Sequence, residues 1–318
     1  MTLSDFLNEW NNDSPVLLVH TSGSTGKPKP MYVEKKRMME SARMTLQFLG
    51  LKPHDSALLC MPLDYIAGKM VVVRSLVGNL NLKDVGAVGH PMADEAAGDC
   101  YVDFAAMVPL QVYNSLGVEK ERQRLMNIRH LLIGGGAVDD GLAAQLRDFP
   151  HAVWSTYGMS ETLSHIALRR VNGPEASEWY TPLSGVTLSS NEDQCLVIEA
   201  PRVSASTIVT HDMVAFAANG RDFRILGRKD YVICCGGVKI QAEEVEERLR
   251  PYIPSPFFIG KAHDAKFGEI PVLVIESEDT QYLNEVFVRV LPKYWIPKKI
   301  VSVSALPLTE TGKPKRLL

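Results

Sequence analysis

A run of small, hydroxylated and basic residues near the start of the chain has the composition of a phosphate-binding loop. Residues 20–29 read His-Thr-Ser-Gly-Ser-Thr-Gly-Lys-Pro-Lys. Glycine lets a backbone come close to phosphate oxygens, hydroxyl groups donate hydrogen bonds to them, and lysine supplies positive charge. The candidate ligands are Thr21, Ser22, Gly23, Ser24, Thr25, Gly26 and Lys29. A surface turn rich in small residues is the alternative interpretation, because it uses the same residue types.

Single residues exclude two better-known loops at this place. A Walker loop, G-x-x-x-x-G-K-[ST], that started at Gly23 would need a second glycine where Pro28 stands. A nucleophile elbow, G-x-S-x-G, centred on Ser24 would need a glycine where Ser22 stands. The loop therefore predicts neither an ordinary P-loop nucleotidase nor an α/β-hydrolase.

Three glycines, Gly134, Gly135 and Gly136, follow an apolar run farther along the chain. A dinucleotide-binding fingerprint, G-x-G-x-x-G, would need its last glycine where Asp139 stands. A tight turn between a strand and a helix is the simpler explanation of the triplet. Such a turn still lets a planar base lie against bare backbone.

Two acidic residues have neighbours that suit a nucleotide. In the segment 155–161, Tyr157 offers a stacking face and Glu161 a hard oxygen ligand for Mg²⁺. Asp212 is able to accept hydrogen bonds from both hydroxyls of a ribose, and Arg228 to bind a ribose or phosphate oxygen. A β-turn with a surface glutamate, a strand-end aspartate and a solvated charge cluster are the alternatives.

The tail at 307–316 contains a glycine turn followed directly by Lys313. A lysine held by such a turn can place a point charge on a reacting phosphate. A disordered basic C-terminus is the alternative, because chain ends are often poorly ordered.

The pattern of apolar runs predicts the elements that must position these residues. Strands are expected at 16–20, 57–61 and 130–133, and helices at 35–49 and 66–77. A further helix is expected to begin at Asp139 or Asp140, with Leu142 and Leu146 on one face. Strands separated by helices indicate an α/β sheet with parallel pairs.

The texture changes after about residue 183, where short β-like segments follow one another closely. The segments 195–200, 206–210, 213–217 and 223–226 predict an antiparallel or barrel-like subdomain. Beyond residue 230 a small α+β unit is expected. Its predicted parts are a strand at 231–235, a glycine turn at 236–237, a helix at 242–249, a strand at 271–276 and a helix at 280–291. The stretch 226–230 is the candidate linker.

Composition narrows the class of protein. Charge is nearly balanced, with 34 basic and 37 acidic residues among 318, so no basic nucleic-acid footprint is indicated. The 5 cysteines include no C-x-x-C pair, which fits a reduced cytoplasmic setting better than a zinc or disulfide protein. The first residues lack a signal-peptide core, and no apolar run reaches the ~20 residues needed to span a bilayer.

Together, in their order and spacing, these motifs resemble the adenylate-forming superfamily of acyl- and aryl-CoA synthetases, adenylation domains and luciferases. The resemblance runs from His20 to Arg316. It implies an α/β large domain at 1–229, with parallel-rich sheets and a small β subdomain at about 184–229. It also implies a mobile α+β lid domain at 230–318.

The resemblance assigns roles to the matching positions. Thr21 and its loop would hold phosphates, Glu161 would help to hold Mg²⁺, and Lys313 would drive adenylation. Asp212 would bind ribose, with a hinge at Asp230. The remaining expected contacts with ATP or coenzyme A are Gly134, Gly135, Gly136, Thr156, Tyr157, Gly158, Ser160, Arg228, Gly236, Gly237 and Lys239.

Two departures from the family pattern stand out. Members usually carry a long segment before the phosphate loop, and here only 20 residues precede it, so an N-terminal subdomain is expected to be missing. Surfaces that it would cover must be polar, rearranged or covered by a partner, and a homodimer is one such cover. In addition, Tyr65 stands where the family often has a histidine beside the acyl pocket.

Within the superfamily, the best clue to substrate is Arg74, six residues after Gly68. In o-succinylbenzoate–CoA ligases of menaquinone synthesis, which the chain resembles, an arginine at the matching place lies close to the acyl site. One carboxylate of such a substrate reacts and the other needs a positive partner, which Arg74, aided by Lys69, would supply. Tyr65 is the third expected substrate residue. A structural salt bridge of Arg74 is the alternative.

The resemblance implies a two-step reaction. A carboxylate attacks the α-phosphorus of MgATP with release of pyrophosphate, and the thiol of coenzyme A then takes the acyl group. Rival interpretations are a ligase for another acid, an enzyme that loads a carrier protein, and a binding protein that has lost catalysis.

Overall fold

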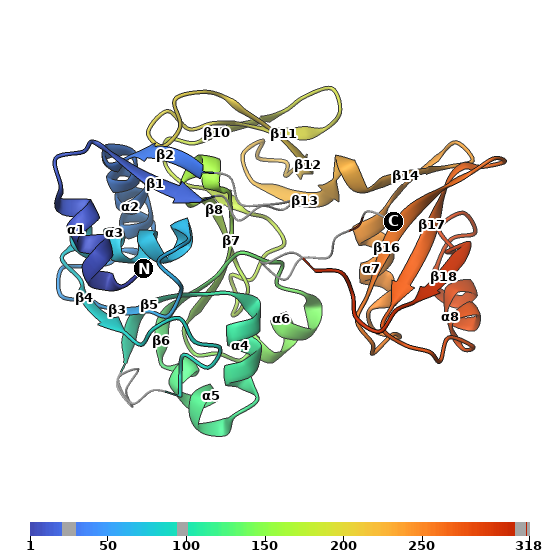
Figure 1. The fold of residues 1–318 in the computed structure, drawn as a ribbon, viewed down its shortest axis with the longest axis horizontal. Coiled ribbons are helices and arrows are strands. Elements are labelled where there is room, and N and C mark those ends of the chain that lie inside the picture. Colours follow the sequence, from blue (N-terminus) through green and yellow to red (C-terminus); the bar gives the residue numbers. More distant parts are fainter. Residues whose placement is uncertain (21–29, 94–100, 309–315, 317–318) are drawn as a thin grey trace.

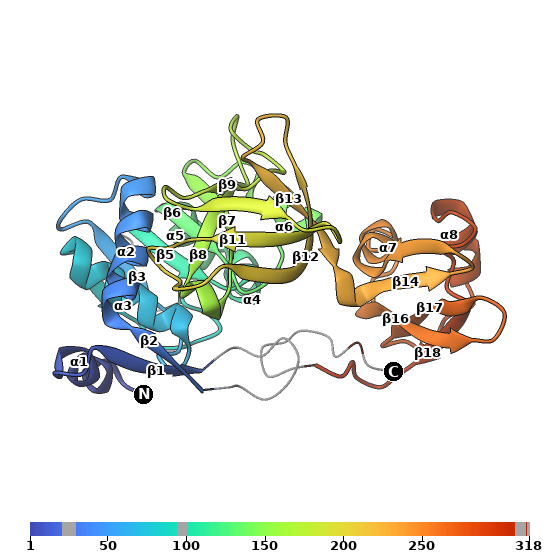
Figure 2. The same ribbon diagram turned by 90° about the horizontal axis from the view of Figure 1, so that it is seen from above.

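The computed structural model describes residues 1–20, 30–93, 101–308 and 316. The expected phosphate loop, Thr21 to Lys29, and Lys313 lie outside these described residues. Figures 1 and 2 show a large unit that ends in strand β13 and a smaller C-terminal unit beside it.

A sheet with seven described strands forms the centre of the large unit, in the order β4-β3-β5-β6-β7-β8-β9. The five strands from β4 to β7 in that order are parallel, and β8 and β9 each run antiparallel to their neighbour. The middle parallel strands are short and mainly apolar, as expected where helices cover both faces of a sheet. The strands are β3 (Ser56–Leu59), β4 (Asn81–Asp84), β5 (Val102–Met107), β6 (Ile128–Ile133), β7 (Ala152–Gly158), β8 (His165–Arg170) and β9 (Thr181–Pro182).

Helices connect the parallel strands, and sequence signals set their ends. The second helix stops at Gly50, whose φ of 64° suits glycine far better than other residues. Asp139 caps the sixth helix, because its side chain accepts a hydrogen bond from the backbone N–H of Leu142. The helices are α1 (Leu3–Asn11), α2 (Lys35–Leu49), α3 (Ile66–Gly78), α4 (Pro109–Leu116), α5 (Glu119–Met126) and α6 (Asp140–Leu146).

Two further sheets belong to the large unit. One is a hairpin of β1 (Val16–His20) and β2 (Pro30–Glu34). The other is antiparallel, with β10 (Thr187–Ser190), β11 (Cys195–Glu199), β12 (Ile208–Phe216) and β13 (Phe223–Arg228) in that order. The expectation of separate strands at 206–210 and 213–217 was wrong. They form the single strand β12, because both parts pair with β11, and a shift of register between the pairs Val197–Val209 and Cys195–Met213 absorbs the extra residues of β12.

In its described residues the C-terminal unit is a mixed sheet with two α-helices. Its first hairpin turns at Gly236 and Gly237, whose φ angles of 57° and 84° are the positive values that a two-residue hairpin loop requires. The elements are β14 (Val232–Cys235), β15 (Val238–Gln241), α7 (Ala242–Leu249), β16 (Phe257–Asp264), β17 (Gly268–Ile275), α8 (Leu283–Val290) and β18 (Lys299–Ser302).

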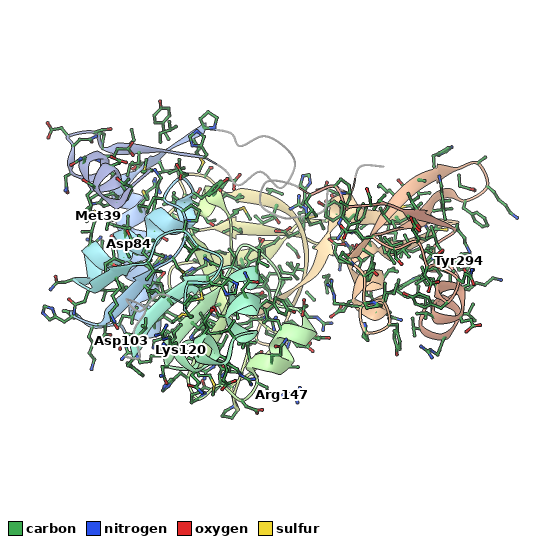
Figure 3. All side chains as sticks on the ribbon, turned by 60° about the horizontal axis from the view of Figure 1, so that its bottom comes forward. Met39, Asp84, Asp103, Lys120, Arg147 and Tyr294 are labelled. Atoms are coloured by element: carbon green, nitrogen blue, oxygen red, sulfur yellow. The ribbon has the colours of Figure 1, made fainter. Side chains whose placement is uncertain are left out.

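The two units have separate hydrophobic cores. The larger core gathers buried residues from Phe6 to Phe223, and another gathers residues from Ile233 to Leu291. Asp84, Lys120 and Arg147, which Figure 3 labels on the large unit, are exposed.

The expected linker at 226–230 is more ordered than predicted. Its first three residues belong to β13, because pairing with β12 continues as far as Arg228. The next three form a single 3₁₀ turn, η3 (Lys229–Tyr231). The predicted α/β class, with a parallel-rich sheet, a small β sheet and a small α+β unit, is confirmed. The domain limits at 229 and 230 stay a prediction.

Candidate active site

A cavity of about 180 Å³ lies where β5, β6 and β7 end. Ligands of open α/β sheets bind beyond the carboxyl ends of the strands, so the position itself suits a substrate. Six of its lining residues were predicted from the sequence: Arg74, Gly134, Gly135, Thr156, Gly158 and Ser160. The structure therefore brings the glycine turn, the 155–161 segment and the substrate arginine to one place.

Close packing explains two of the glycines beside the cavity. A Cβ atom on Gly134 would lie 2.5 Å from Oγ1 of Thr156, and one on Gly158 would lie 2.3 Å from the carbonyl oxygen of Ser164. Real Cβ atoms do not approach so closely, so the neighbours would have to move. Both positions thus require glycine for structural reasons, beyond any contact with a nucleotide.

Gly158→Ala is expected to lower the free energy of unfolding by about 2–4 kcal/mol, because the methyl group meets backbone rather than a movable side chain. Urea unfolding measures the loss as a lower midpoint at an unchanged slope. Gly89→Ala is the control, since its nearest neighbour is a side-chain atom of Asn114 at 3.4 Å. Equal midpoints for the two variants would contradict the packing argument.

Arg74 on α3 is the charged group of the cavity. Its side chain is only 2% exposed, and its Nη2 donates to Oγ of Ser164 at 2.6 Å. The buried Nε has no partner, and no carboxylate among the described residues lies within ion-pair distance of the guanidinium. Burial lowers the pKa of Arg74 to about 9, so the group still carries its charge at neutral pH.

The other two predicted substrate residues lie elsewhere. The ammonium of Lys69 is 3.8 Å from a carboxylate oxygen of Glu9 and lies over the ring of Phe6, both on α1. Tyr65 precedes the first residue of α3 and forms a backbone bridge with His20. Neither lines the cavity, so the geometry does not bring them to Arg74.

Three predicted nucleotide residues meet through the register of β12 and β13. Asp212 lies opposite Arg228, whose Nη1 is 3.1 Å from Oδ1 of Asp212. The hydroxyl of Tyr157 donates to Oδ2 of the same carboxylate at 2.6 Å. Burial, together with the charge of Asp212, raises the pKa of Tyr157 and keeps the phenol neutral. The cluster presents a carboxylate whose position is fixed from two sides.

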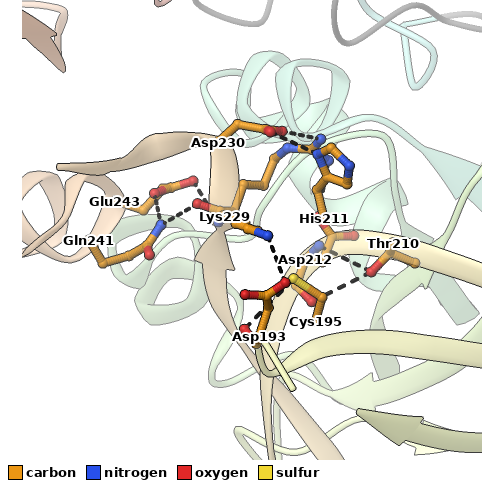
Figure 4. A network of polar contacts seen from close by, with 10 residues as sticks. Asp193, Cys195, Thr210, His211, Asp212, Lys229, Asp230, Gln241 and Glu243 are labelled. Atoms are coloured by element: carbon orange, nitrogen blue, oxygen red, sulfur yellow. Dashed lines mark hydrogen bonds and ion pairs between the residues drawn. The ribbon is translucent and has the colours of Figure 1, made fainter. Parts of the chain in front are cut away.

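Arg228 also holds the expected hinge. Its Nη2 donates to Asp230 at 2.8 Å, and Nδ1 of His211 lies 2.7 Å from the other oxygen of that carboxylate (Figure 4). The carbonyl of Arg228 accepts from Nε2 of Gln241 at 3.0 Å, and its backbone N–H donates to Glu243. One residue thus connects the β subdomain, η3 and the first helix region of the C-terminal unit.

Glu161 lies in the short 3₁₀ turn η2 (Ser160–Thr162), with its side chain exposed. Within the described ranges no group of three or more acidic, histidine or cysteine side chains could hold a metal. A lone exposed carboxylate suits Mg²⁺ that takes its remaining ligands from phosphate and water. The residues present therefore fit a metal that arrives with a nucleotide.

The remaining predicted residues are spread over the two units. Gly136 packs against Pro109 and does not line the cavity. Gly236 and Gly237 form the tip of the β14–β15 hairpin, and Lys239 is exposed on β15.

The last described residue, Arg316, is anchored to the C-terminal unit. Its guanidinium forms an ion pair with Glu246 on α7, donates to the carbonyl of Ile259 at 2.9 Å and lies 4.6 Å from the centre of the Tyr231 ring. Lys313 stands three residues earlier in the sequence. The anchor therefore ties this end of the tail to the C-terminal sheet.

Comparison with known proteins decides the family. The model of the AMP-binding enzyme family matches residues 5–194, which is more than half of the 318 residues. The chain belongs to this family. The predicted AMP-forming acid–CoA ligase is thereby confirmed at the level of the family.

Relatives of this AMP-binding enzyme include a 2-succinylbenzoate–CoA ligase of Enterococcus faecalis, 24% identical over 95% of this chain and 68% of that protein. An AMP-forming acyl-CoA synthetase/AMP-acid ligase II-like protein of Dyadobacter fermentans is 35% identical, with a TM-score of 0.68 over 98% of this chain and 91% of the other. An o-succinylbenzoate coenzyme A synthetase of Bacillus subtilis, solved with ATP and magnesium, is 23% identical, with a TM-score of 0.77 over 94% of this chain and 68% of the other.

Two groups of functional interest escaped the sequence analysis. Ser164 and His165 lie beside Arg74 and line the cavity, although neither belongs to a predicted motif.

Across the described part of the chain, no helix is both long and apolar enough to cross a membrane.

Proposed function

We propose that this AMP-binding enzyme joins coenzyme A to an acid that carries a second carboxylate, with o-succinylbenzoate as the best candidate. The observation that carries the proposal is Arg74, a buried cation that lines the cavity without a carboxylate partner among the described residues. A buried charge is costly unless it is paired, so a site of this kind is completed by an anionic ligand. The names of the curated relatives support the same acid.

The acid would lie in the cavity with its non-reacting carboxylate on Arg74. Planar bidentate recognition suits a guanidinium and a carboxylate, and the low exposure of Arg74 strengthens their attraction. The apolar walls, which include Met107, Val108 and Leu163, would take the aromatic ring. The reacting carboxylate would then point towards the nucleotide side.

ATP, with Mg²⁺ on its phosphates, supplies the adenylyl group and the leaving pyrophosphate. Asp212 would accept hydrogen bonds from the ribose, with Arg228 and Tyr157 fixing the carboxylate. Glu161 would hold the metal, Thr21 and its loop the β- and γ-phosphates, and Lys313 the charge on the attacked phosphate. No side chain is needed as a nucleophile, because positioning and electrostatic stabilisation carry the chemistry.

Two half-reactions follow in order. A carboxylate oxygen forms a bond to the α-phosphorus while the bond to pyrophosphate breaks, which gives an acyl-adenylate. The thiol of coenzyme A, losing its proton, then forms a bond to the acyl carbon while AMP leaves. Residues 230–318 would turn as a lid about Asp230 between the two steps, which would withdraw Lys313 and bring Gly236, Gly237 and Lys239 towards the coenzyme.

The test is ATP–pyrophosphate exchange that depends on added acid. The panel contains o-succinylbenzoate, its two analogues that each lack one carboxylate, and benzoate. Exchange that is strongest with o-succinylbenzoate and is followed by thioester formation with free coenzyme A is the expected result. The proposal would be refuted if none of the acids supported exchange, or if o-succinylbenzoate and both analogues supported it equally. If the second step required a carrier protein in place of coenzyme A, the enzyme would be one that loads a carrier protein.

Asp212→Asn is expected to raise the KM for ATP about 10- to 100-fold, because a neutral amide replaces a charge-assisted acceptor of the ribose hydroxyls. The KM is measured by exchange at saturating acid. Asp193→Asn is the matched control, since Asp193 forms only an exposed ion pair with Lys229 and such pairs contribute little. An unchanged KM in the Asp212 variant would remove that residue from the ribose site.

A further inference from the structure

A chain of uncharged side chains runs from the Arg74 guanidinium to the backbone of α2. Nη2 of Arg74 is 2.6 Å from Oγ of Ser164, which lies 3.5 Å from Nδ1 of His165. Nε2 of His165 is 2.9 Å from Oγ1 of Thr45, and that hydroxyl donates to the carbonyl of Ser41 at 3.2 Å. His165 is 8% exposed and Thr45 fully buried. We call Ser164, His165 and Thr45 the neutral relay.

We propose that the neutral relay fixes the direction of the Arg74 guanidinium for the non-reacting carboxylate of the substrate, and that His165 is its central positioning residue. The proposal rests on the proposed function, because it concerns the same cavity and the same second carboxylate. It adds residues that belong to no motif of the sequence. It also explains how a buried arginine is held although no acidic side chain in the described ranges pairs with it.

The far end of the relay fixes the direction of every hydrogen bond in it. The Ser41 carbonyl only accepts, so the Thr45 hydroxyl must donate to it. Thr45 can then only accept from His165, which places the imidazole proton on Nε2 and leaves Nδ1 as an acceptor. Ser164 accepts from Arg74 and directs its own proton towards Nδ1. The arrangement needs neutral His165 with its proton on Nε2.

The surroundings of His165 favour the neutral form. Burial, and then the charge of Arg74, hold the pKa of His165 well below its ordinary value. A carboxylate in place of the relay would neutralise the guanidinium and remove the reason for an anion to bind. Neutral hydrogen bonds orient the group and leave its whole charge to the ligand. The relay therefore fixes the direction of the Arg74 guanidinium without neutralising its charge.

The cavity supplies an independent observation. Arg74, Ser164 and His165 all line it, together with apolar side chains such as Met61 and Leu163. Nε of Arg74 is buried without a partner, so the guanidinium retains a donor that the relay does not use. An anionic oxygen in the cavity would accept from such donors. The relay thus lies directly behind the proposed carboxylate site.

Kinetics with matched acids test the proposal in the full-length enzyme. His165→Phe is expected to raise the KM for o-succinylbenzoate about tenfold, through a loosened guanidinium, with kcat changed less than about twofold. The analogue that lacks the non-reacting carboxylate should show a change below about twofold. His165→Asn keeps an acceptor near the Nδ1 position and should restore most of the preference. His130→Phe is the control, because His130 is a half-buried imidazole on β6 whose Nδ1 is buried without a partner and which does not line the cavity.

Equal losses for both acids, or an unchanged preference in His165→Phe, would overturn the relay. If His165→Phe does not fold, Thr45→Val carries the same test, because it removes the acceptor of Nε2 at nearly constant volume. A preference unchanged in Thr45→Val would count against the relay in the same way.

Nitrogen NMR of labelled histidine separates this proposal from the proposed function. His165, identified by its absence in His165→Asn, is expected to be neutral at pH 7 with its proton on Nε2. A proton on Nδ1, or on both nitrogens, would overturn the relay whatever acid the enzyme prefers. The expected tautomer in an enzyme without preference for a dicarboxylate would instead refute the proposed function alone.

Discussion

Replacing Lys313 by alanine is expected to lower the rate of adenylate formation about 10²- to 10³-fold, the cost of losing one preorganised charge on a reacting oxygen. The same variant should convert a supplied acyl-adenylate to the thioester at nearly the normal rate. The reason is that attack on the α-phosphorus, with the charge that then develops on its oxygens, belongs to the first half-reaction, whereas the thiol attacks an acyl carbon. In the proposed mechanism the lid would turn away for the thiol step and withdraw Lys313.

The two half-reactions are measured separately. Pyrophosphate exchange reports the first, and thioester formation from synthetic acyl-adenylate reports the second. Lys315→Ala is the matched control, because it removes the same charge two residues along the same tail. An equal loss in both half-reactions would contradict the division of labour. A loss as large in the Lys315 variant would reduce the role of Lys313 to general charge.

Replacing Arg74 by methionine is expected to lower kcat/KM for o-succinylbenzoate about 100-fold, mainly through KM, because a charged hydrogen-bond partner of the second carboxylate is lost. Activity with the analogue that lacks this carboxylate should stay nearly constant. Stability should respond in the opposite sense. Methionine of similar volume removes a buried charge that has no carboxylate partner among the described residues, so the free energy of unfolding should rise by about 1 kcal/mol.

Lys69→Met is the matched control for Arg74→Met. Lys69 is also a buried cation on α3, yet its ammonium lies with Glu9 and Phe6 rather than in the cavity. Its loss should leave the preference between the two acids unchanged and should lower stability. If Arg74→Met lowers stability and leaves the preference intact, Arg74 serves the fold and the substrate site lies elsewhere.

The sequence could predict which motifs lie close together, because each of them follows or ends a parallel strand of the same sheet. Gly134 follows β6, and Thr156 and Gly158 end β7. The carboxyl ends of neighbouring parallel strands share one edge of a sheet, so these residues converge on one cavity. The glycine turn at 236–237 was also predictable, because a two-residue hairpin loop needs positive φ at both positions.

The spacing of Lys69 and Arg74 on the helix at 66–78 already argued against the prediction that Lys69 aids Arg74. Lys69 and Arg74 are five residues apart, which places them ~140° apart around a helix of 3.6 residues per turn. They therefore face different partners, as the structure shows for Glu9 and Ser164. Helical geometry alone argued against joint action on one carboxylate.

Other features depend on tertiary packing that a single sequence does not encode locally. Ser164 meets Arg74 across 90 residues of chain, and His165 meets Thr45 across 120. Short polar residues next to a strand carry no pattern that would mark them. The register that sets Asp212 opposite Arg228 likewise depends on a bulge, because Met213 pairs with Gly227 and Val214 with Ile225, which leaves Leu226 of β13 as an extra residue.

The two contacts of the Arg228 guanidinium have a thermodynamic consequence. One Nη group lies on Asp212, the candidate ribose ligand, and the other on Asp230, the candidate hinge (Figure 4). A nucleotide that shares or displaces the contact with Asp212 would alter the free energy of the contact with Asp230. Nucleotide binding and the conformation of the hinge are then thermodynamically linked. Linkage is reciprocal. A ligand whose affinity depends on the position of the C-terminal unit would therefore change the affinity for the nucleotide by the same factor by which the nucleotide changes the affinity for that ligand.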